Sequence, residues 1–300
     1  MGKNIIAEVL YASPNVEIFN ESEGHAKKLI GILSRDFKYA SVLGTDVKGK
    51  EYEVRKTGTS ITDSLWNERG FVVRVFNGYN YTEYSFNELS EDTLDLLVDK
   101  IKEKAEDDIK NLKSAGINIS NYPVIEEEKL TMSHYKEVEI LPEEKTAEYR
   151  IKKMTEIMNE ALSYSDLLVD FNVRYEECHI SKIFISQNKD LEQSYIWSQG
   201  NILALVRRDN NTKYYYDGVA GLKGVELLDE LRAKAKVVVE NAEKLLDAKR
   251  ITPGEYDVIC SPEIAGLIAH EAFGHGVEMD MFVKNRAKAV EYIGKYVASE

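Results

Sequence analysis

The stretch Leu167–Tyr216, LLVDFNVRYEECHISKIFISQNKDLEQSYIWSQGNILALVRRDNNTKYYY, decides the fold class. It holds five runs rich in aliphatic and aromatic residues, which are typical of strands: Leu167–Tyr175, Ile180–Gln187, Glu192–Ser198, Asn201–Arg208 and Lys213–Tyr216. Turn-forming residues at Asn188–Asp190 and Asp209–Asn211 separate some of these runs. The stretch therefore predicts an antiparallel meander.

Helices and further strands flank the meander. Apolar residues at helical spacing predict one helix over Glu143–Ser163 and another over Val225–Lys249. Upstream, the same spacing predicts helices over Glu23–Arg35 and from Ser90 to about Lys113. Four strand-like runs lie between these two helices: Tyr39–Leu43, Tyr52–Lys56, Phe71–Phe76 and Tyr79–Phe86. Asn77-Gly78 predicts a two-residue hairpin turn between the last two runs.

Blocks of strands and blocks of helices together predict an α+β fold. We expect an N-terminal α/β unit over 1–116, closed by a helix cap at Gly116, and a central antiparallel-sheet unit with long helices over 117–250. The irregular, acidic segment 117–145 is expected to connect them. A third unit covers 251–300. Its last apolar stripe has no closing cap, so more protein is expected after Glu300.

Composition argues against several classes of function. The chain has 39 basic and 52 acidic residues, a net charge of −13, and acids flank its densest basic spots, so direct nucleic-acid binding is not expected. The longest charge-free stretch, Gln193–Val206, is shorter than the roughly 18 residues of a membrane span. Two cysteines and an N-terminus without the apolar core of a signal peptide favour the cytoplasm.

The residues with recognisable chemistry are His270-Glu271-Ala272-Phe273-Gly274-His275, an HExxxH sequence. Imidazole nitrogens are preferred zinc ligands, so His270 and His275 are predicted to bind Zn²⁺. Glu271 is then the general base for a metal-bound water, a combination that hydrolyses amides. The alternative is that both histidines are structural and Glu271 is simply solvated.

The spacing of the two histidines sets a geometric condition. Residues five apart diverge by about 140° around an ideal α-helix, so their rings cannot share an ion. Shared ligation needs a π-bulge or an unwound last turn, and Gly274 is where such a break costs least.

Residues His270–Asp280, HEAFGHGVEMD, resemble the signature of the TldD/PmbA family, also called modulators of DNA gyrase, which includes TldD-like zinc metalloproteases. The preceding stretch Glu255–Ala269 and the residues Glu68-Arg69-Gly70 are also similar in character. The order of the three units matches as well. The resemblance implies that 251–300 is the beginning of the metal-binding metallopeptidase domain.

The resemblance further implies a zinc-dependent peptidase acting on peptides or unfolded protein segments, as a homodimer or as a heterodimer with a homologous subunit. The family's third zinc ligand is a cysteine far downstream, which would lie beyond Glu300. Cys178 and Cys260 do not match it, and both are expected to be buried strand thiols. Because two histidines alone bind zinc weakly, the 300-residue piece by itself is expected to lack full activity.

Several features leave alternatives open. A second function class is a non-catalytic, protein-binding regulatory partner, similar to a gyrase modulator, with structural histidines. Glu278 and Asp280 either support an imidazole or are solvated acids. Tyr214–Tyr216 are expected to pack in a strand, and His179 to have a surface or core role. Exposed sheet edges are a possible place for an extended peptide to add as a strand.

Overall fold

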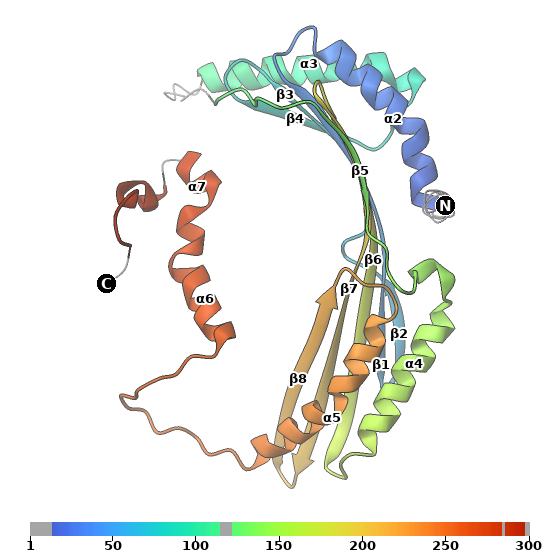
Figure 1. Cartoon of the computed structure of the whole chain (residues 1–300), viewed down its shortest axis with the longest axis vertical. Coiled ribbons are helices and arrows are strands. Elements are labelled where there is room, and N and C mark those ends of the chain that lie inside the picture. Colours follow the sequence, from blue (N-terminus) through green and yellow to red (C-terminus); the bar gives the residue numbers. More distant parts are fainter. Residues whose placement is uncertain (1–13, 115–121, 284–285, 298–300) are drawn as a thin grey trace. The chain divides into compact units, whose positions relative to one another are not determined.

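The computed structural model describes residues 14–114, 122–283 and 286–297 (Figure 1). The chain divides into two compact units, Met1–Ala248 and Lys249–Glu300. The predicted cap at Gly116 lies outside the described residues.

One eight-stranded sheet forms the first unit, in the order β4-β3-β1-β6-β7-β5, with β2 beside β1 and β8 beside β7. Its strands are β1 (Ala40–Arg55), β2 (Gly58–Asp63), β3 (Glu68–Phe76), β4 (Tyr81–Phe86), β5 (Leu130–Tyr135), β6 (Leu168–Ser186), β7 (Lys189–Arg208) and β8 (Asn211–Gly221). Neighbouring strands are antiparallel except β5 and β7, which run parallel. The α+β class and the antiparallel β6-β7-β8 meander are confirmed.

The long strands differ from the prediction. β1, β6 and β7 are each one continuous strand where the sequence predicts two runs. Polar residues such as Glu176–His179 interrupt the apolar pattern of β6, but they stay in register with β1 and β7. β5 falls in the segment expected to be only a connection, and β2 is an unpredicted, exposed strand. The link between β3 and β4 has four residues, since Phe76 pairs with Tyr81.

The described part of the first unit has four α-helices and one 3₁₀ helix: α2 (Pro14–Leu33), α3 (Glu91–Ser114), η1 (Pro142–Glu144), α4 (Ala147–Leu162) and α5 (Leu227–Leu246). α2 and α3 share one hydrophobic core with parts of β1, β3 and β6. α4 and α5 share a second core with β1, β6 and β7. Figure 1 shows α4 and α5 lying along the half of the sheet that contains β8.

Both helix pairs cover the same face of the sheet. In β1, Ala40 and Val42 enter the first core and Tyr52 and Val54 enter the second. All four are even-numbered positions of one regularly paired strand, and successive side chains of a strand alternate between faces. The two cores are therefore neighbours on one face, with the middle of the sheet between them.

The sheet runs through both of the units predicted over 1–116 and 117–250, because β1 pairs with β6 from Ser41 to Val54. Each of these segments nevertheless supplies the helices of one core. The division of the chain into domains at residues 116 and 250 stays a prediction. Tyr214–Tyr216 lie in a strand, β8, as expected, but they are 36–64% exposed, so the expectation that they are packed is wrong.

The second unit contains α6 (Pro262–Ala272), the 3₁₀ helix η2 (Gly274–Val277), α7 (Met279–Val283) and the 3₁₀ helix η3 (Lys288–Tyr292). The expectation that Cys260 is a buried strand thiol is wrong, because residues 256–260 have no regular structure and Cys260 is exposed. Cys178 is buried in β6 as predicted. Across the described ranges, no helix is long and apolar enough to cross a membrane.

Candidate metal centre

The helix that carries His270 begins with a well-defined cap. The Ser261 hydroxyl accepts a hydrogen bond from the Ile264 backbone N–H at 3.4 Å, and Pro262 occupies the first turn. Proline suits this position because its missing N–H would have no helical partner. α6 then runs to Ala272 and places His270 in its last turn.

The α-helix ends between the two histidines. Phe273 has φ −133° and ψ −40°, outside the helical region, and a tighter 3₁₀ turn starts at Gly274. The predicted break thus takes the form of an unwound last turn. It centres on Phe273 rather than on Gly274, whose φ is not in the left-handed region and where an added Cβ would make only ordinary contacts.

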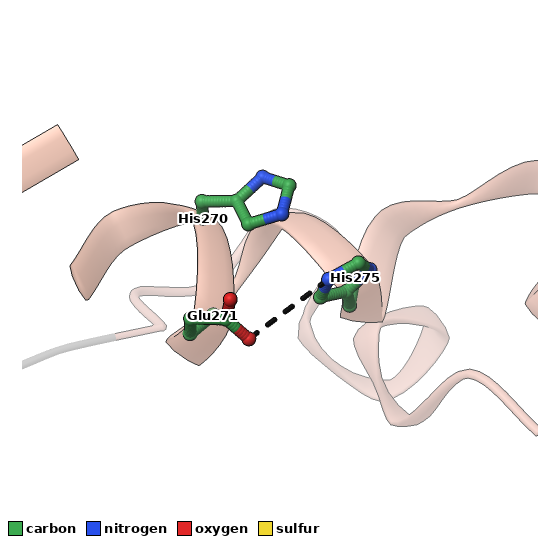
Figure 2. Close-up of side chains that lie close together, drawn as sticks. All are labelled: His270, Glu271 and His275. Atoms are coloured by element: carbon green, nitrogen blue, oxygen red, sulfur yellow. Dashed lines mark ion pairs between the residues drawn. The ribbon is translucent and has the colours of Figure 1, made fainter. Parts of the chain in front are cut away.

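The break brings the HExxxH side chains together. The ring centroids of His270 and His275 are 4.5 Å apart, and His275 Nε2 lies 3.9 Å from Glu271 Oε2. One potential ligand atom from each of the three residues lies within 4.8 Å of the others. Figure 2 shows this cluster, with the ion pair between Glu271 and His275 as a dashed line. All three side chains are exposed.

Glu278 fixes the second histidine. His275 Nδ1 donates a hydrogen bond to Glu278 Oε1 at 2.7 Å, which leaves Nε2 as the nitrogen with a free lone pair. The hydrogen bond and charge of Glu278 raise the pKa of His275, and the charge of Glu271 adds to the rise. A metal ion at this ring therefore competes with a proton, and the competition weakens as pH rises.

The donor set fits zinc. The two imidazoles are nitrogen donors of the kind found in zinc sites, and the Glu271 carboxylate lies beside them in the place of a general base. Tetrahedral zinc with bonds of about 2.1 Å keeps its ligand atoms about 3.4 Å apart, whereas the candidate ligand atoms here are up to 4.8 Å apart. Because the three side chains are exposed, small rotations can cover the difference without disturbing a core.

Ionisable side chains also form a buried cluster in the first unit, which the sequence pattern did not predict. In the first unit, buried Arg150 donates through Nε to Glu177 Oε2 at 2.9 Å, and His179 Nδ1 lies 2.6 Å from Glu143 Oε1. Glu177 and His179 share the odd-numbered face of β6 with the core residue Val173. This alternation is the signal that could have indicated their burial.

Comparisons with known proteins place the chain among metalloprotease-like relatives. Curated relatives found by sequence are named metalloproteases. One, from Methanocaldococcus jannaschii, is 27% identical over 242 residues, which make up 77% of this chain and 50% of the relative. The chain thus spans half the length of that relative. No family model matches the chain.

Solved structures share the fold at low sequence identity. A protein from Bacteroides thetaiotaomicron, described as a modulator of DNA gyrase, superposes with a TM-score of 0.67 at 13% identity, over 92% of this chain and 62% of that one. TldE from Thermococcus kodakarensis superposes with a TM-score of 0.52 at 15% identity, over 89% of this chain and 58% of that one. These neighbours and the metalloprotease relatives confirm the resemblance to the TldD/PmbA family.

Proposed function

We propose that this chain is part of a zinc-dependent peptidase in which His270 and His275 hold Zn²⁺ and Glu271 is the catalytic base. The observation that carries the proposal is the helix break at Phe273, which gathers two imidazoles and a carboxylate into one cluster. The metalloprotease names of the sequence relatives support the same reaction class. Because the chain spans half of such a relative, the activity is proposed for the whole protein.

Each residue has a distinct part in the proposed chemistry. Bound zinc would act as a Lewis acid toward the scissile carbonyl and lower the pKa of water. The exposed Glu271 carboxylate accepts a proton from the attacking water and returns it to the leaving amine. Glu278 holds His275 Nδ1 and so directs Nε2 toward the cluster.

The remaining parts of the proposal come from the family resemblance. The substrates are peptides or unfolded protein segments, and the protein works in the cytoplasm as a homodimer or with a homologous subunit. A cysteine beyond Glu300 is the third zinc ligand. Residues 251–300 are then the beginning of the metallopeptidase domain.

The test is a Glu271→Gln substitution in the full-length protein, assayed on unstructured peptides by mass spectrometry. Loss of the base should lower the cleavage rate by about 10²–10⁴-fold while the zinc content stays unchanged. Glu263→Gln, the same change in the first turn of α6, is the matched control and should cleave normally. Unchanged cleavage by Glu271→Gln would remove Glu271 from the mechanism. A wild-type protein without zinc and without cleavage would favour a non-catalytic binding partner.

A further inference from the structure

Between the two cores, the helix-covered face of the sheet is polar. Asp46 of β1, Glu177, His179 and Ser181 of β6 and Ser194 of β7 are each less than a tenth exposed. On both sides of this strip the same face carries apolar core residues. Burying polar and ionisable groups costs free energy that apolar residues would not, so the strip indicates a use other than folding.

Two ionisable groups of this strip, Glu177 and His179, have side-chain partners, whereas Asp46 Oδ2 has no hydrogen-bond partner among the described residues. Arg150 forms a salt bridge of 2.6 Å with Glu177 and donates to the carbonyl oxygens of Pro142, Lys145 and Thr146. His179 binds Glu143 through Nδ1, and its Nε2 lies 2.9 Å from Ser194 Oγ. These contacts fix the start of α4 against β6.

A cavity of about 450 Å³ lies over these groups. Its walls include charged side chains together with the Tyr52 ring, Pro142 and Ala147, and we call it the seam pocket. It also contacts Lys48-Gly49, where β1 has no paired outer strand because pairing with β3 ends at Val47 and pairing with β2 begins at Lys50. Gly49 instead donates to Asn67 Oδ1 and accepts from the Ser64 N–H. The volume is that of a site for a small organic molecule.

The seam pocket has an excess of positive charge. Two of its three acids form salt bridges, Asp63 with Lys50 and Glu177 with Arg150, and the third, Glu143, is hydrogen-bonded to His179. Lys48 and Lys145 also line it, and within the described residues neither has a carboxylate partner. Lys145 instead lies over the Tyr149 ring at 5.3 Å. Two unmatched ammonium groups in one pocket are unusual on a chain whose net charge is −13.

We propose that the seam pocket binds a small organic oxyanion, a carboxylate or a phosphate monoester, whose charge is held by Lys48 and Lys145. The organic part of the ligand lies against Tyr52, Pro142 and Ala147. Arg150 and Glu177, which also line the pocket, already bind each other, so the charge of the ligand is left to Lys48 and Lys145. This site is independent of the HExxxH cluster and of the proposed peptidase activity.

The test is isothermal titration calorimetry of the purified chain at low ionic strength with phenyl phosphate, with benzoate and with uncharged benzyl alcohol. At least one anion should bind saturably and benzyl alcohol should not. Lys48→Gln combined with Lys145→Gln should weaken that binding at least tenfold. The anion that binds more tightly identifies the ligand class.

A matched control separates the pocket from general surface charge. Lys129→Gln with Lys213→Gln removes the same charge from two exposed lysines outside the pocket and should change the affinity less than twofold. Circular dichroism checks that both double variants keep the fold. Failure of both anions to bind, equal weakening in the two double variants, or equal binding of benzyl alcohol would each overturn the proposal.

Discussion

The two units of this chain place their apolar residues in opposite ways. In the first unit, Phe171 and Leu231 are completely buried and belong to one of two cores. In the second unit, no residue of α6 is buried, and Ile251 and Ile259 are 82% and 99% exposed. Packing of buried apolar side chains therefore stabilises the first unit. The described structure of the second unit depends instead on contacts between residues that are close in sequence.

Those local contacts are the ones that shape the candidate metal centre. The Ser261 cap, the bend at Phe273 and the bond between His275 and Glu278 all join residues close in sequence. Exposed apolar side chains around them, such as Ile268, are typical of a surface that contacts other protein.

The largest difference is expected between equivalent truncations in the two units. Phe171→Ala removes a fully buried ring and should lower the free energy of unfolding of the first unit by about 3–5 kcal/mol. Ile268→Ala, at a side chain that is 54% exposed, should change stability by less than about 0.5 kcal/mol. Urea unfolding followed by tryptophan fluorescence measures the first, and hydrogen exchange of α6 measures the second. Equal destabilisation by Phe171→Ala and Ile268→Ala would contradict the difference in packing between the two units.

Breaking the buried ion pair of the first unit should be nearly as damaging. Arg150→Ala leaves Glu177 buried without its partner and should cost about 3–5 kcal/mol. Arg150→Met with Glu177→Leu replaces both charges and should recover most of that loss in urea unfolding. If the double variant is as unstable as Arg150→Ala, the cost lies in packing rather than in the orphaned charge.

A smaller, pH-dependent effect is expected at Glu143. Burial raises the pKa of this carboxyl, but the hydrogen bond and charge of His179 outweigh it and the net pKa is lowered. A lowered pKa contributes stability above the unfolded value near 4.3, which is lost as pH falls through the folded value. Glu143→Gln should therefore cost at most about 1 kcal/mol at pH 7, since the carboxylate is 40% exposed. The urea unfolding midpoints of the wild type and of Glu143→Gln should converge at acid pH. A difference that persists there would contradict the role of the ionised Glu143 carboxylate.

The smallest effect is expected at the cap of α6. Ser261→Ala removes a long hydrogen bond and should destabilise the first turn by about 0.5 kcal/mol. Faster amide exchange at Ile264, with no change in α4 or α5, is the expected signature. Unchanged exchange would mean that contacts other than the cap hold the helix start.

Helices were the most predictable part of the fold because their signal is local. The apolar spacing in α3, α4 and α5 predicts each helix to within a few residues of its ends. The strands β1, β6 and β7 are longer than predicted because pairing with distant strands carries them through polar stretches such as Glu176–His179. That stabilisation comes from partners remote in sequence, so no local pattern reports it.

The candidate metal centre was predictable for the same reason, since all its residues lie within one short motif. The 140° argument correctly predicts that the helix must break, but the backbone bends at Phe273, one residue before Gly274. The pairing of Glu143 with His179 joins residues 36 positions apart, so it depends on how the 3₁₀ turn η1 (Pro142–Glu144), just before α4, lies against β6. Only the folded chain reveals it.

The central claim is that His270 and His275 hold one zinc ion. The most direct measurement is zinc K-edge X-ray absorption on the zinc-loaded full-length protein, compared with His270→Ala, His275→Ala and Glu271→Gln. We predict two imidazole nitrogens at about 2.0–2.1 Å in the wild type and in Glu271→Gln, and the loss of one imidazole in each histidine variant. A zinc site whose imidazole scattering is the same in all four proteins would contradict the account.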